Sequence, residues 1–295
     1  MRTACLVALL VLLSLPLAPA LAEPPAATPS DDTTTCLGCH ATTHPGLVAD
    51  WQAGRHALVT PAADRARPAA ARRLSAATVP EALAGHTVGC AECHTANAGK
   101  HADSFEHNGF QVHVVVTPED CALCHAEERA QYAGNLMAHA YGNLMGNALY
   151  ADLQRLVVGA ATLDGAGRVA HAAPEASQLD DACLTCHGTK VAVTGQATRE
   201  TVLGEMAFPV LAGWPNQGVG RINPDGSMGA CPSCHTRHRF SLAEARKPDA
   251  CEGCHKGPDV PAYKVWEVSK HGAIAAAHGD SWNWEAVPWT PGKDF

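Results

Sequence analysis

Hydrophobic residues recur at helical spacing in two long stretches of this 295-residue chain. Residues 127–156 have the spacing of a helix, and the three glycines inside this stretch favour a division into two helices. A second helical pattern covers residues 260–277. The apolar side chains available for burial in the first stretch are Leu136, Met137, Leu144, Met145, Leu149, Leu153 and Leu156.

Shorter patterns between these stretches predict little sheet. Residues 111–116 indicate a short β-strand ended by Pro118, and residues 118–120 predict the start of a helix. Residues 159–177 predict a loop or a hairpin. Residues 214–229 are dense in glycine, proline and asparagine and predict an irregular loop, and such a loop is often functional in a compact protein. The expected fold class is therefore mainly α with few short strands.

The N-terminus has the pattern of a secretory signal peptide over residues 1–22. Arg2 is followed by an apolar run over residues 6–17 and by small residues before Glu23. That run is too short to span a membrane, so we expect a cleaved signal and a soluble periplasmic protein. Residues 23–35 are rich in proline, threonine and aspartate and predict a flexible lead-in. Residues 36–295 are expected to form one domain organised around its cofactors.

Six Cys-x-x-Cys-His segments carry the strongest chemical signal, and we number them motifs 1 to 6 in chain order. They occupy residues 36–40, 90–94, 121–125, 183–187, 231–235 and 251–255. Two cysteines at this spacing can each add across one vinyl group of a haem, and the following histidine binds the iron from one side. The cysteines are Cys36, Cys39, Cys90, Cys93, Cys121, Cys124, Cys183, Cys186, Cys231, Cys234, Cys251 and Cys254. The histidines are His40, His94, His125, His187, His235 and His255.

Zinc sites and disulfides are the alternative uses of paired cysteines. Zinc ribbons pair their cysteine knuckles and place any histidine at a different offset. Disulfide frameworks have no reason to place a histidine after every second cysteine. Of the thirteen cysteines, Cys5 lies in the predicted signal peptide and the other twelve all lie in the motifs. We therefore expect six covalently attached c-type haems.

Composition changes this picture in two ways. Apolar residues make up 46% of the chain and aromatic residues only 5%, a modest supply for a protein core of this length. The haems are therefore expected to provide much of the buried apolar surface. The formal net charge of −8 argues against nucleic acid as a partner and favours a basic electron carrier over an acidic one.

A haem that only transfers electrons needs a second axial histidine from elsewhere in the chain. Seventeen histidines minus the six in the motifs leaves eleven. Three of them stand on predicted helices, each beside a small residue that lets the ring approach a porphyrin: His56, His139 and His271. His107 and His238 complete the predicted set of five, with His113 as the chief competitor of His107. Five distal ligands for six haems leave one iron open, and the spacing does not say which.

Longer stretches of the chain resemble the octahaem hydroxylamine oxidoreductase family of bacterial periplasmic cytochromes. The similarity extends well beyond the haem motifs and covers nearly all of the chain after the signal peptide except residues 60–83. The stretches that carry it include HPG at 44–46, HNG at 107–109, NLMAHAY at 135–141, WPNQGVGR at 214–221, ARKP at 245–248 and SKHG at 269–272.

The resemblance implies that the fourth haem is catalytic and has an open distal face, while the others, each held by two histidines, transfer electrons. Motif 4 takes that place here, with His187 as its proximal ligand. Asp225 is a candidate proton donor, although capping of a turn is its simpler role. The implied substrates are hydroxylamine, nitrite and similar small nitrogen compounds. The implied partners are a soluble or membrane-bound electron carrier, of the cytochrome or quinone system, and two further copies of the chain in a homotrimer.

Two features depart from the family pattern. The family carries eight haems, whereas this chain has six motifs and ends at Phe295, before the seventh is expected. The C-terminal helices that bear a cross-linking tyrosine in the oxidising members are also missing, so we expect a shortened octahaem protein. Two questions stay open: the direction of the reaction, oxidation or reduction, and the alternative of a non-catalytic electron-transfer cytochrome.

Overall fold

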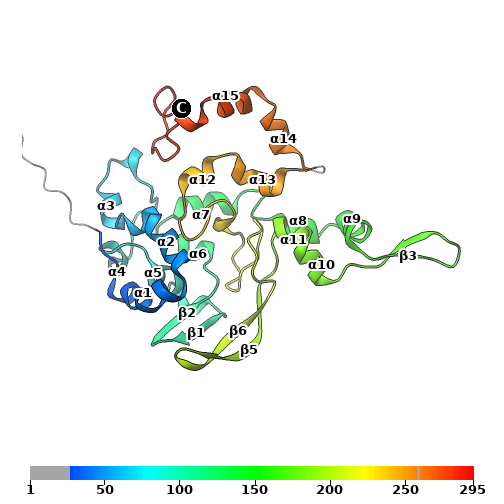
Figure 1. The fold of residues 1–295 in the computed structure, drawn as a ribbon, viewed down its shortest axis with the longest axis horizontal. Helices are drawn as coiled ribbons and strands as arrows, with labels where there is room; N and C mark the ends of the chain where they lie inside the picture. The colour runs from blue at the N-terminus through cyan, green and yellow to red at the C-terminus, as the bar shows by residue number, and fades with distance from the viewer. Residues whose placement is uncertain (1–26, 258–259) are drawn as a thin grey trace, which may run out of the picture.

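The computed structural model describes residues 27–257 and 260–295, and it is mainly helical with three separate two-stranded hairpins, as predicted (Figure 1). The predicted signal peptide lies outside the described residues. The α-helices are α1 (Asp31–Thr43), α2 (Pro45–Ala53), α3 (Pro61–Arg65), α4 (Glu81–Ala84), α5 (Cys90–His94), α6 (Pro118–Cys121), α7 (Ala126–Ala133), α8 (Ala140–Met145), α9 (Ala148–Val158), α10 (Ala176–Asp181), α11 (Cys183–His187), α12 (Leu242–Arg246), α13 (Asp249–His255), α14 (Ala262–Glu267) and α15 (Lys270–His278). The antiparallel hairpins are β1 (Ser104–His107) with β2 (Phe110–His113), β3 (Ala161–Leu163) with β4 (Val169–His171), and β5 (Ala192–Thr201) with β6 (Gly204–Ala212).

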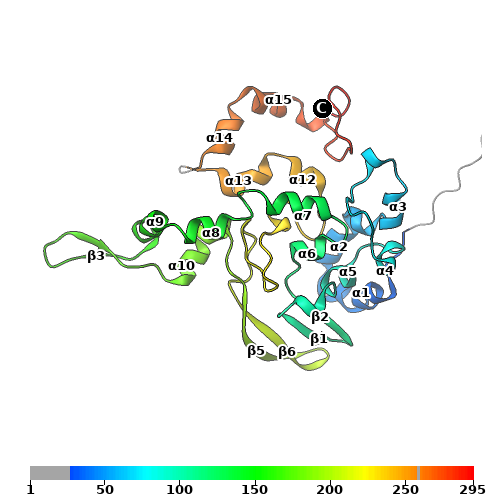
Figure 2. The same ribbon diagram turned by 180° about the vertical axis from the view of Figure 1, so that it is seen from behind.

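The helices α1 to α7 and the β1–β2 hairpin build a body that also includes the β5–β6 hairpin and the α12–α13 segment (Figures 1 and 2). An arm made of α8, α9, the β3–β4 hairpin and α10 projects from this body, with α11 at its base. The α14–α15 segment lies over α12 and α13. None of the described helices combines the length and the hydropathy of a membrane span.

The haem motifs occupy short helical segments. Motif 1 lies inside α1, motifs 2 and 4 are the whole of α5 and α11, and motif 6 ends α13. On a helical turn, residues three and four positions apart share one face, so each motif presents its cysteines and its histidine together. The helix α1 begins at Asp31 because the Ser30 side chain accepts a hydrogen bond from the Thr33 backbone N–H. Residues 31–35 are therefore helical, which corrects part of the expected flexible lead-in.

A buried polar contact fixes motif 1 against motif 2. Glu92, within α5, accepts hydrogen bonds from the Gly89 backbone N–H at 2.8 Å and from the Thr33 hydroxyl at 2.7 Å. The Thr33 hydroxyl oxygen in turn accepts a bond from the Ala91 backbone N–H at 3.1 Å. Thr33 is fully buried. These bonds close the open N-terminal end of α5 and join it to α1, which brings the first two motifs together.

The 127–156 stretch differs most from its prediction. It forms three helices, α7, α8 and α9, because Gly134 and Gly146 end the first two of them. The prediction that its apolar side chains are buried was wrong for most of them. Leu144 is buried, whereas Leu136 is 81% and Leu149 72% exposed. The stretch lies mostly in the projecting arm, which has no second layer to cover it.

Other predicted elements are close to what the structure has. The strand predicted at 111–116 is β2, which pairs with β1 and ends at His113, and α6 begins at Pro118 as predicted. Residues 159–177 include the β3–β4 hairpin, and residues 214–229 form no helix or strand. The helix expected over 260–277 is divided into α14 and α15. The β5–β6 hairpin was not predicted, although β5 is rich in β-branched residues and Gly204 follows its two-residue turn, Val202-Leu203.

The buried hydrophobic side chains of the described residues are small. They are Ala76, Ala91, Val115, Ala138, Leu144, Leu184, Val191 and Ala230, with nothing larger than leucine. Buried polar and charged residues outnumber them. A protein of this length with so little apolar core needs another source of buried surface.

Candidate haem sites

A cavity of about 400 Å³ opens in the body between motifs 1, 2, 3 and 5. Its walls combine apolar side chains with motif cysteines and histidines, the lining that a covalently held porphyrin requires. The motif residues in the wall are Cys36, His40, Cys90, Cys93, His94, Cys121 and Cys231. Large apolar residues beside them include Leu47, Trp51, Phe105, Phe208 and Trp214. The chain therefore offers, at these motifs, the donor set and the apolar lining that c-type haem needs.

Contacts between cysteines connect all six motifs into one series. A c-type haem is attached through its edge, so sulfur atoms that lie close together bring porphyrin edges close together. Two pairs interact most strongly, Cys121 with Cys231 and Cys186 with Cys254. Three further pairs interact electrostatically: Cys36 with Cys90, Cys93 with Cys124, and Cys234 with Cys251. The spatial order of the motifs is therefore 1, 2, 3, 5, 6, 4.

Several proximal histidines are already oriented for iron. In metal sites the ring nitrogen opposite the metal usually bonds a carbonyl or a carboxylate, which fixes the ring. His94 Nδ1 lies 2.9 Å from the His113 carbonyl oxygen, and His187 Nδ1 lies 3.3 Å from that of Ala140. His125 and His235 bond the backbone of Arg73 and Ser241. His40 Nδ1 lies 3.0 Å from His44 Nδ1, a partner that the sequence analysis did not identify.

Three proximal histidines face a second imidazole at the separation that one iron requires, and in one of these pairs, His94 with His113, the ring centroids are 6.0 Å apart. A metal–nitrogen bond is about 2 Å, so two rings on opposite sides of one iron have centroids roughly 6 Å apart. The His40 and His107 centroids are 6.0 Å apart, and those of His125 and His56 are 6.3 Å apart. His56 and His107 both line the cavity. The geometry favours them as distal ligands for motifs 3 and 1.

Burial favours the neutral, ligating form of these rings. It lowers the pKa of His56 to about 4, and the neighbouring His125 adds to that shift. The pKa of His125 is lowered as well, mainly by burial. Burial also raises the pKa of the Cys93 thiol to about 12. A thioether bond to haem would remove that proton, and with it the cost of placing an ionisable thiol in this cavity.

His113 and His238 compete as the partner for motif 2: the His113 ring centroid lies 6.0 Å from that of His94, but carbonyl oxygens engage both of its ring nitrogens. His113 Nδ1 lies 3.2 Å from the Val115 carbonyl oxygen and its Nε2 lies 3.0 Å from that of Ala96, so both ring nitrogens are engaged. His238 lines the cavity, and its Nδ1 is buried without a hydrogen-bond partner. Burial lowers the pKa of His238 and the nearby His94 adds to that shift, which places the two rings near each other.

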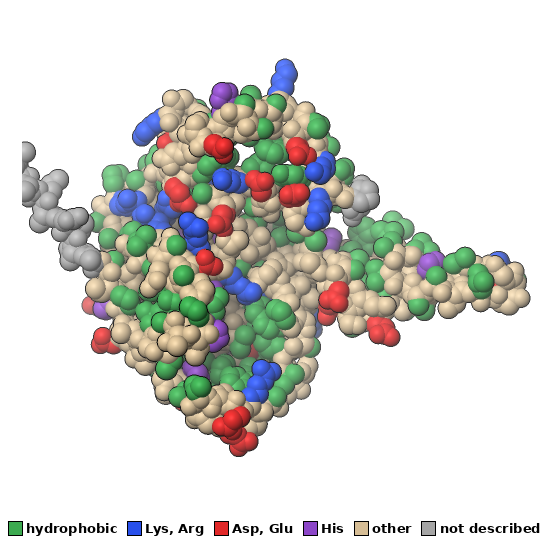
Figure 3. Space-filling model, in the orientation of Figure 1, with side chains coloured by type: hydrophobic (Ala, Val, Ile, Leu, Met, Phe, Trp, Pro, Cys, Tyr) green, Lys and Arg blue, Asp and Glu red, His purple; other side chains and the backbone are tan. Residues whose placement is uncertain are grey.

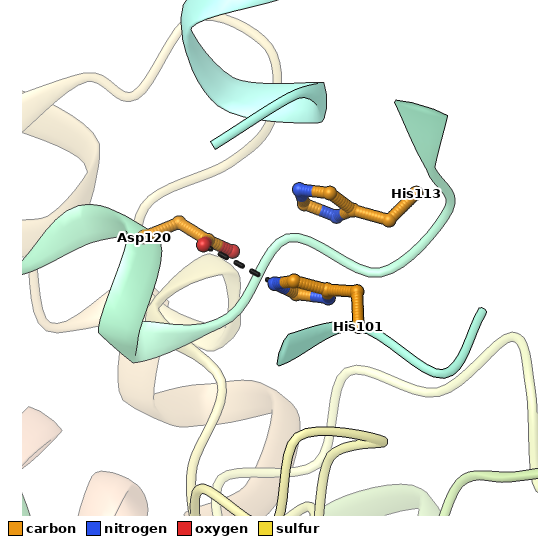
Figure 4. A group of neighbouring side chains, drawn as sticks. All are labelled: His101, His113 and Asp120. Carbon is orange, nitrogen blue, oxygen red and sulfur yellow. Dashed lines mark hydrogen bonds and ion pairs between the residues drawn. The ribbon is translucent and has the colours of Figure 1, made fainter. Parts of the chain in front are cut away.

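The cluster of His101, His113 and Asp120 beside motif 2 has ligand atoms within 4.8 Å of one another (Figure 4). The two rings stack at a centroid distance of 3.6 Å and an angle of 11°, so no position lies in the plane of both rings, where a ring nitrogen binds metal. His101 Nε2 instead lies 3.2 Å from Asp120 Oδ1, and its Nδ1 lies 3.4 Å from Asp103 Oδ1. The cluster is a buried polar network in which the contact between His101 and Asp120 joins the segment before β1 to α6.

The remaining predicted distal ligands are less engaged with haem motifs. His139 Nε2 lies 2.9 Å from the Ala133 carbonyl oxygen, and His271 is exposed on α15. Within residues 27–257 and 260–295, neither ring is in contact with a motif histidine. The same range places no second imidazole against His187 of motif 4. Their roles as distal ligands stay predictions.

Asp225 lies near motif 3. Its Oδ2 accepts a hydrogen bond from the Thr117 hydroxyl at 2.7 Å, and its Oδ1 accepts from the Ser227 backbone N–H at 2.9 Å. Burial by itself raises the pKa of Asp225, but the bonds from Ser227 and Thr117 outweigh it and lower that pKa. An ionised carboxylate that caps a turn is the role this geometry describes best. The backbone of the same loop, by contrast, packs on motif 4: Gly220 lies against the His187 carbonyl.

Comparison with known proteins agrees with the motif chemistry. Residues 223–290 match the family model described as "Seven times multi-haem cytochrome CxxCH". A probable nitrite reductase-hydroxylamine oxidoreductase fusion protein from Kuenenia stuttgartiensis is 32% identical over 136 residues, which is 40% of this chain and 15% of that protein.

Two solved structures extend the comparison. A hypothetical multiheme protein is 42% identical, with a TM-score of 0.84 over 92% of this chain and 51% of its own length. A reducing HAO-like protein complex of Kuenenia stuttgartiensis is 21% identical, with a TM-score of 0.48 over 86% of this chain and 37% of its own. The chain thus spans about half or less of each relative. In its haem motifs and in these comparisons, the chain is similar to multihaem cytochromes of the CxxCH type.

Proposed function

We propose that the chain binds six c-type haems, one at each motif, and conducts electrons through them to or from an open haem at motif 4 that reacts with hydroxylamine, nitrite or a related compound. The observation that carries the electron-transfer part is the series of sulfur contacts through all six motifs. Haem supplies the redox chemistry, and the protein positions each haem and tunes its potential through axial ligands and burial.

Two observations support motif 4 as the reacting site. The Ala140 carbonyl orients the ring of His187, and in the described chain no second imidazole lies against that ring. His235 and His255 share this feature, so the family resemblance selects motif 4 among the three. The name of one relative joins nitrite reductase to hydroxylamine oxidoreductase, which supports a small nitrogen compound as the substrate. Asp225 is set aside as proton donor, because its carboxylate is engaged beside motif 3.

A periplasmic location and a basic electron-carrier partner belong to the same proposal. The predicted signal peptide supports export, and covalent haem attachment takes place outside the bacterial cytoplasm. The net charge of −8 supports a partner of opposite charge. A homotrimer stays an implication of the family resemblance.

The test is a count of high-spin irons in the purified protein, by electron paramagnetic resonance and optical spectra, with hydroxylamine, nitrite and cyanide added in turn. One high-spin iron in six, shifted by these molecules, is the expected result. The paired substitution Cys183→Ala/Cys186→Ala should remove that signal together with one haem mass. An entirely low-spin, unresponsive spectrum would instead assign the protein to electron transfer alone.

A matched variant shows that the measurement detects an opened site. His56→Ala removes the distal ring that faces His125 and should convert one low-spin iron into a second high-spin iron. An unchanged spectrum in that variant would contradict the pairing of His56 with motif 3. A mature protein with no mass beyond its amino acids would contradict haem attachment altogether.

A further inference from the structure

The loop between motifs 4 and 5 places two guanidinium groups against the cavity. Arg221 is 1% exposed, whereas Arg237 is solvent-exposed, and both line the cavity wall. The Arg221 Cζ atom lies 5.2 Å and the Arg237 Cζ atom 5.5 Å from the centre of the Trp214 ring. Two cations therefore share one indole, and the buried one, Arg221, lies where its charge is less screened than in water.

The partners of these cations are neutral. Arg221 donates to the Asn223 side chain at 2.7 Å, to the Asn216 carbonyl at 2.8 Å and to the Val116 carbonyl at 3.3 Å. The guanidinium of Arg237 faces the side-chain amide of Gln217. Within the described residues neither arginine forms an ion pair with a carboxylate.

This arrangement is costly without an anion. Burial lowers the pKa of Arg221 to about 10, and the charge of Arg237 adds to that shift. The carboxylate that acts to raise the pKa of Arg221 is Asp225. Its oxygens already accept hydrogen bonds from Thr117 and Ser227. A buried charge without a paired charge costs several kcal/mol, so such groups normally face an opposite charge. Guanidinium groups are shaped to bind carboxylates.

We propose that Arg221 and Arg237 bind a propionate carboxylate of the haem attached at motif 2, an inference that rests on the proposed haem at that motif. Arg237 precedes His238 in the chain and interacts electrostatically with both His238 and His94. The haem bound by His94 therefore lies beside the arginine pair. The propionates stand on the porphyrin edge opposite the thioethers, and Arg221 lies near Cys231, the thioether side of the motif 5 haem. That position disfavours the propionates of motif 5.

The test is a spectroelectrochemical titration of the haem-loaded protein. Positive charge stabilises the reduced haem, so Arg237→Gln and Arg221→Gln should each lower the midpoint potential of one low-spin haem. A tenfold shift in its reduction equilibrium, about 59 mV for a one-electron couple, is expected. Arg237→Lys keeps the charge and should restore at least half of the shift. Arg246→Gln is the control, because Arg246 lies over Trp289 and does not line the cavity.

Three results would overturn the proposal. One is an Arg237→Gln protein with full haem content and unchanged potentials. A second is an equal shift in Arg246→Gln, which would indicate general surface charge. A third is loss of nitrite binding with unchanged potentials, which would assign the pair to an exogenous anion. If Arg221→Gln cannot be obtained with haem, Arg237→Gln decides. An unsubstituted protein without haem would instead contradict the proposed function.

Discussion

The body and the projecting arm arrange apolar surface in opposite ways. In the body, apolar side chains line a concave cavity into which motif cysteines and ring nitrogens also point. In the arm, the apolar side chains of α9 face outward, with Leu149 72% and Leu156 60% exposed, and Figure 3 shows hydrophobic side chains gathered over this arm. Hydrophobic pattern alone therefore does not mark a haem site. A haem site is indicated by an apolar wall combined with ligand atoms that converge on the same cavity.

The helix α9 shows how far the arm departs from an ordinary amphipathic helix. Its buried residue is Gln154, whose amide lies 3.8 Å from the Met145 sulfur. Leu153, next to it in sequence, is 51% exposed. A helix normally turns its apolar stripe toward the core. Here α9 packs only on its neighbours in the arm. The expectation that its leucines are buried is therefore wrong.

The largest expected effect is on the body. Cys90→Ala/Cys93→Ala prevents haem attachment at motif 2 and should leave part of the cavity unfilled. At about 24 cal/mol per Å³, leaving the whole 400 Å³ cavity empty would cost on the order of 10 kcal/mol, so an unfilled part of it costs several kcal/mol, a large fraction of the stability of a domain. We expect loss of the cooperative thermal transition in circular dichroism. A native-like transition in that variant would show that the body does not depend on haem.

An intermediate effect should distinguish the two kinds of leucine in the arm. Leu144→Ala removes a buried side chain and should reduce the free energy of unfolding by about 2–5 kcal/mol. Leu149→Ala, its exposed counterpart on α9, should change it by less than about 0.5 kcal/mol. Denaturant unfolding of the haem-loaded protein measures both. Equal losses would mean that the α9 surface is covered in solution.

The smallest effect concerns the bond between motifs 1 and 2. Thr33→Val keeps the shape of a fully buried side chain but removes its bonds to Glu92 and to the Ala91 backbone N–H. Leaving those groups unpaired should cost about 1–3 kcal/mol in unfolding free energy. Thr34→Val, at an exposed neighbouring position of α1, is the control and should have little effect. Similar losses of unfolding free energy in both variants would mean that the cost comes from helix propensity and not from the buried contact.

Half of the candidate site could be predicted from the sequence, because haem attachment is local. The two cysteines and the proximal histidine of a motif lie within five residues, so their chemistry depends on one helical turn. The start of α6 and the glycine-rich loop before motif 5 were also predictable, since proline and glycine act on the backbone where they stand. The pairs of histidines and of arginines that meet in the body could not be predicted, because they join residues far apart in the chain.

The sequence by itself determined that this protein carries c-type haem motifs, is mainly helical and has too few large apolar residues for an ordinary core. Only the tertiary structure decided which imidazoles face each other, favouring His107 over His113 opposite His40, and placed motif 5 between motifs 3 and 6. It also brought Arg221 and Arg237 to one indole. The reason is physical: a covalent motif needs only neighbouring residues, whereas axial pairs and charge pairs depend on how distant segments pack in space.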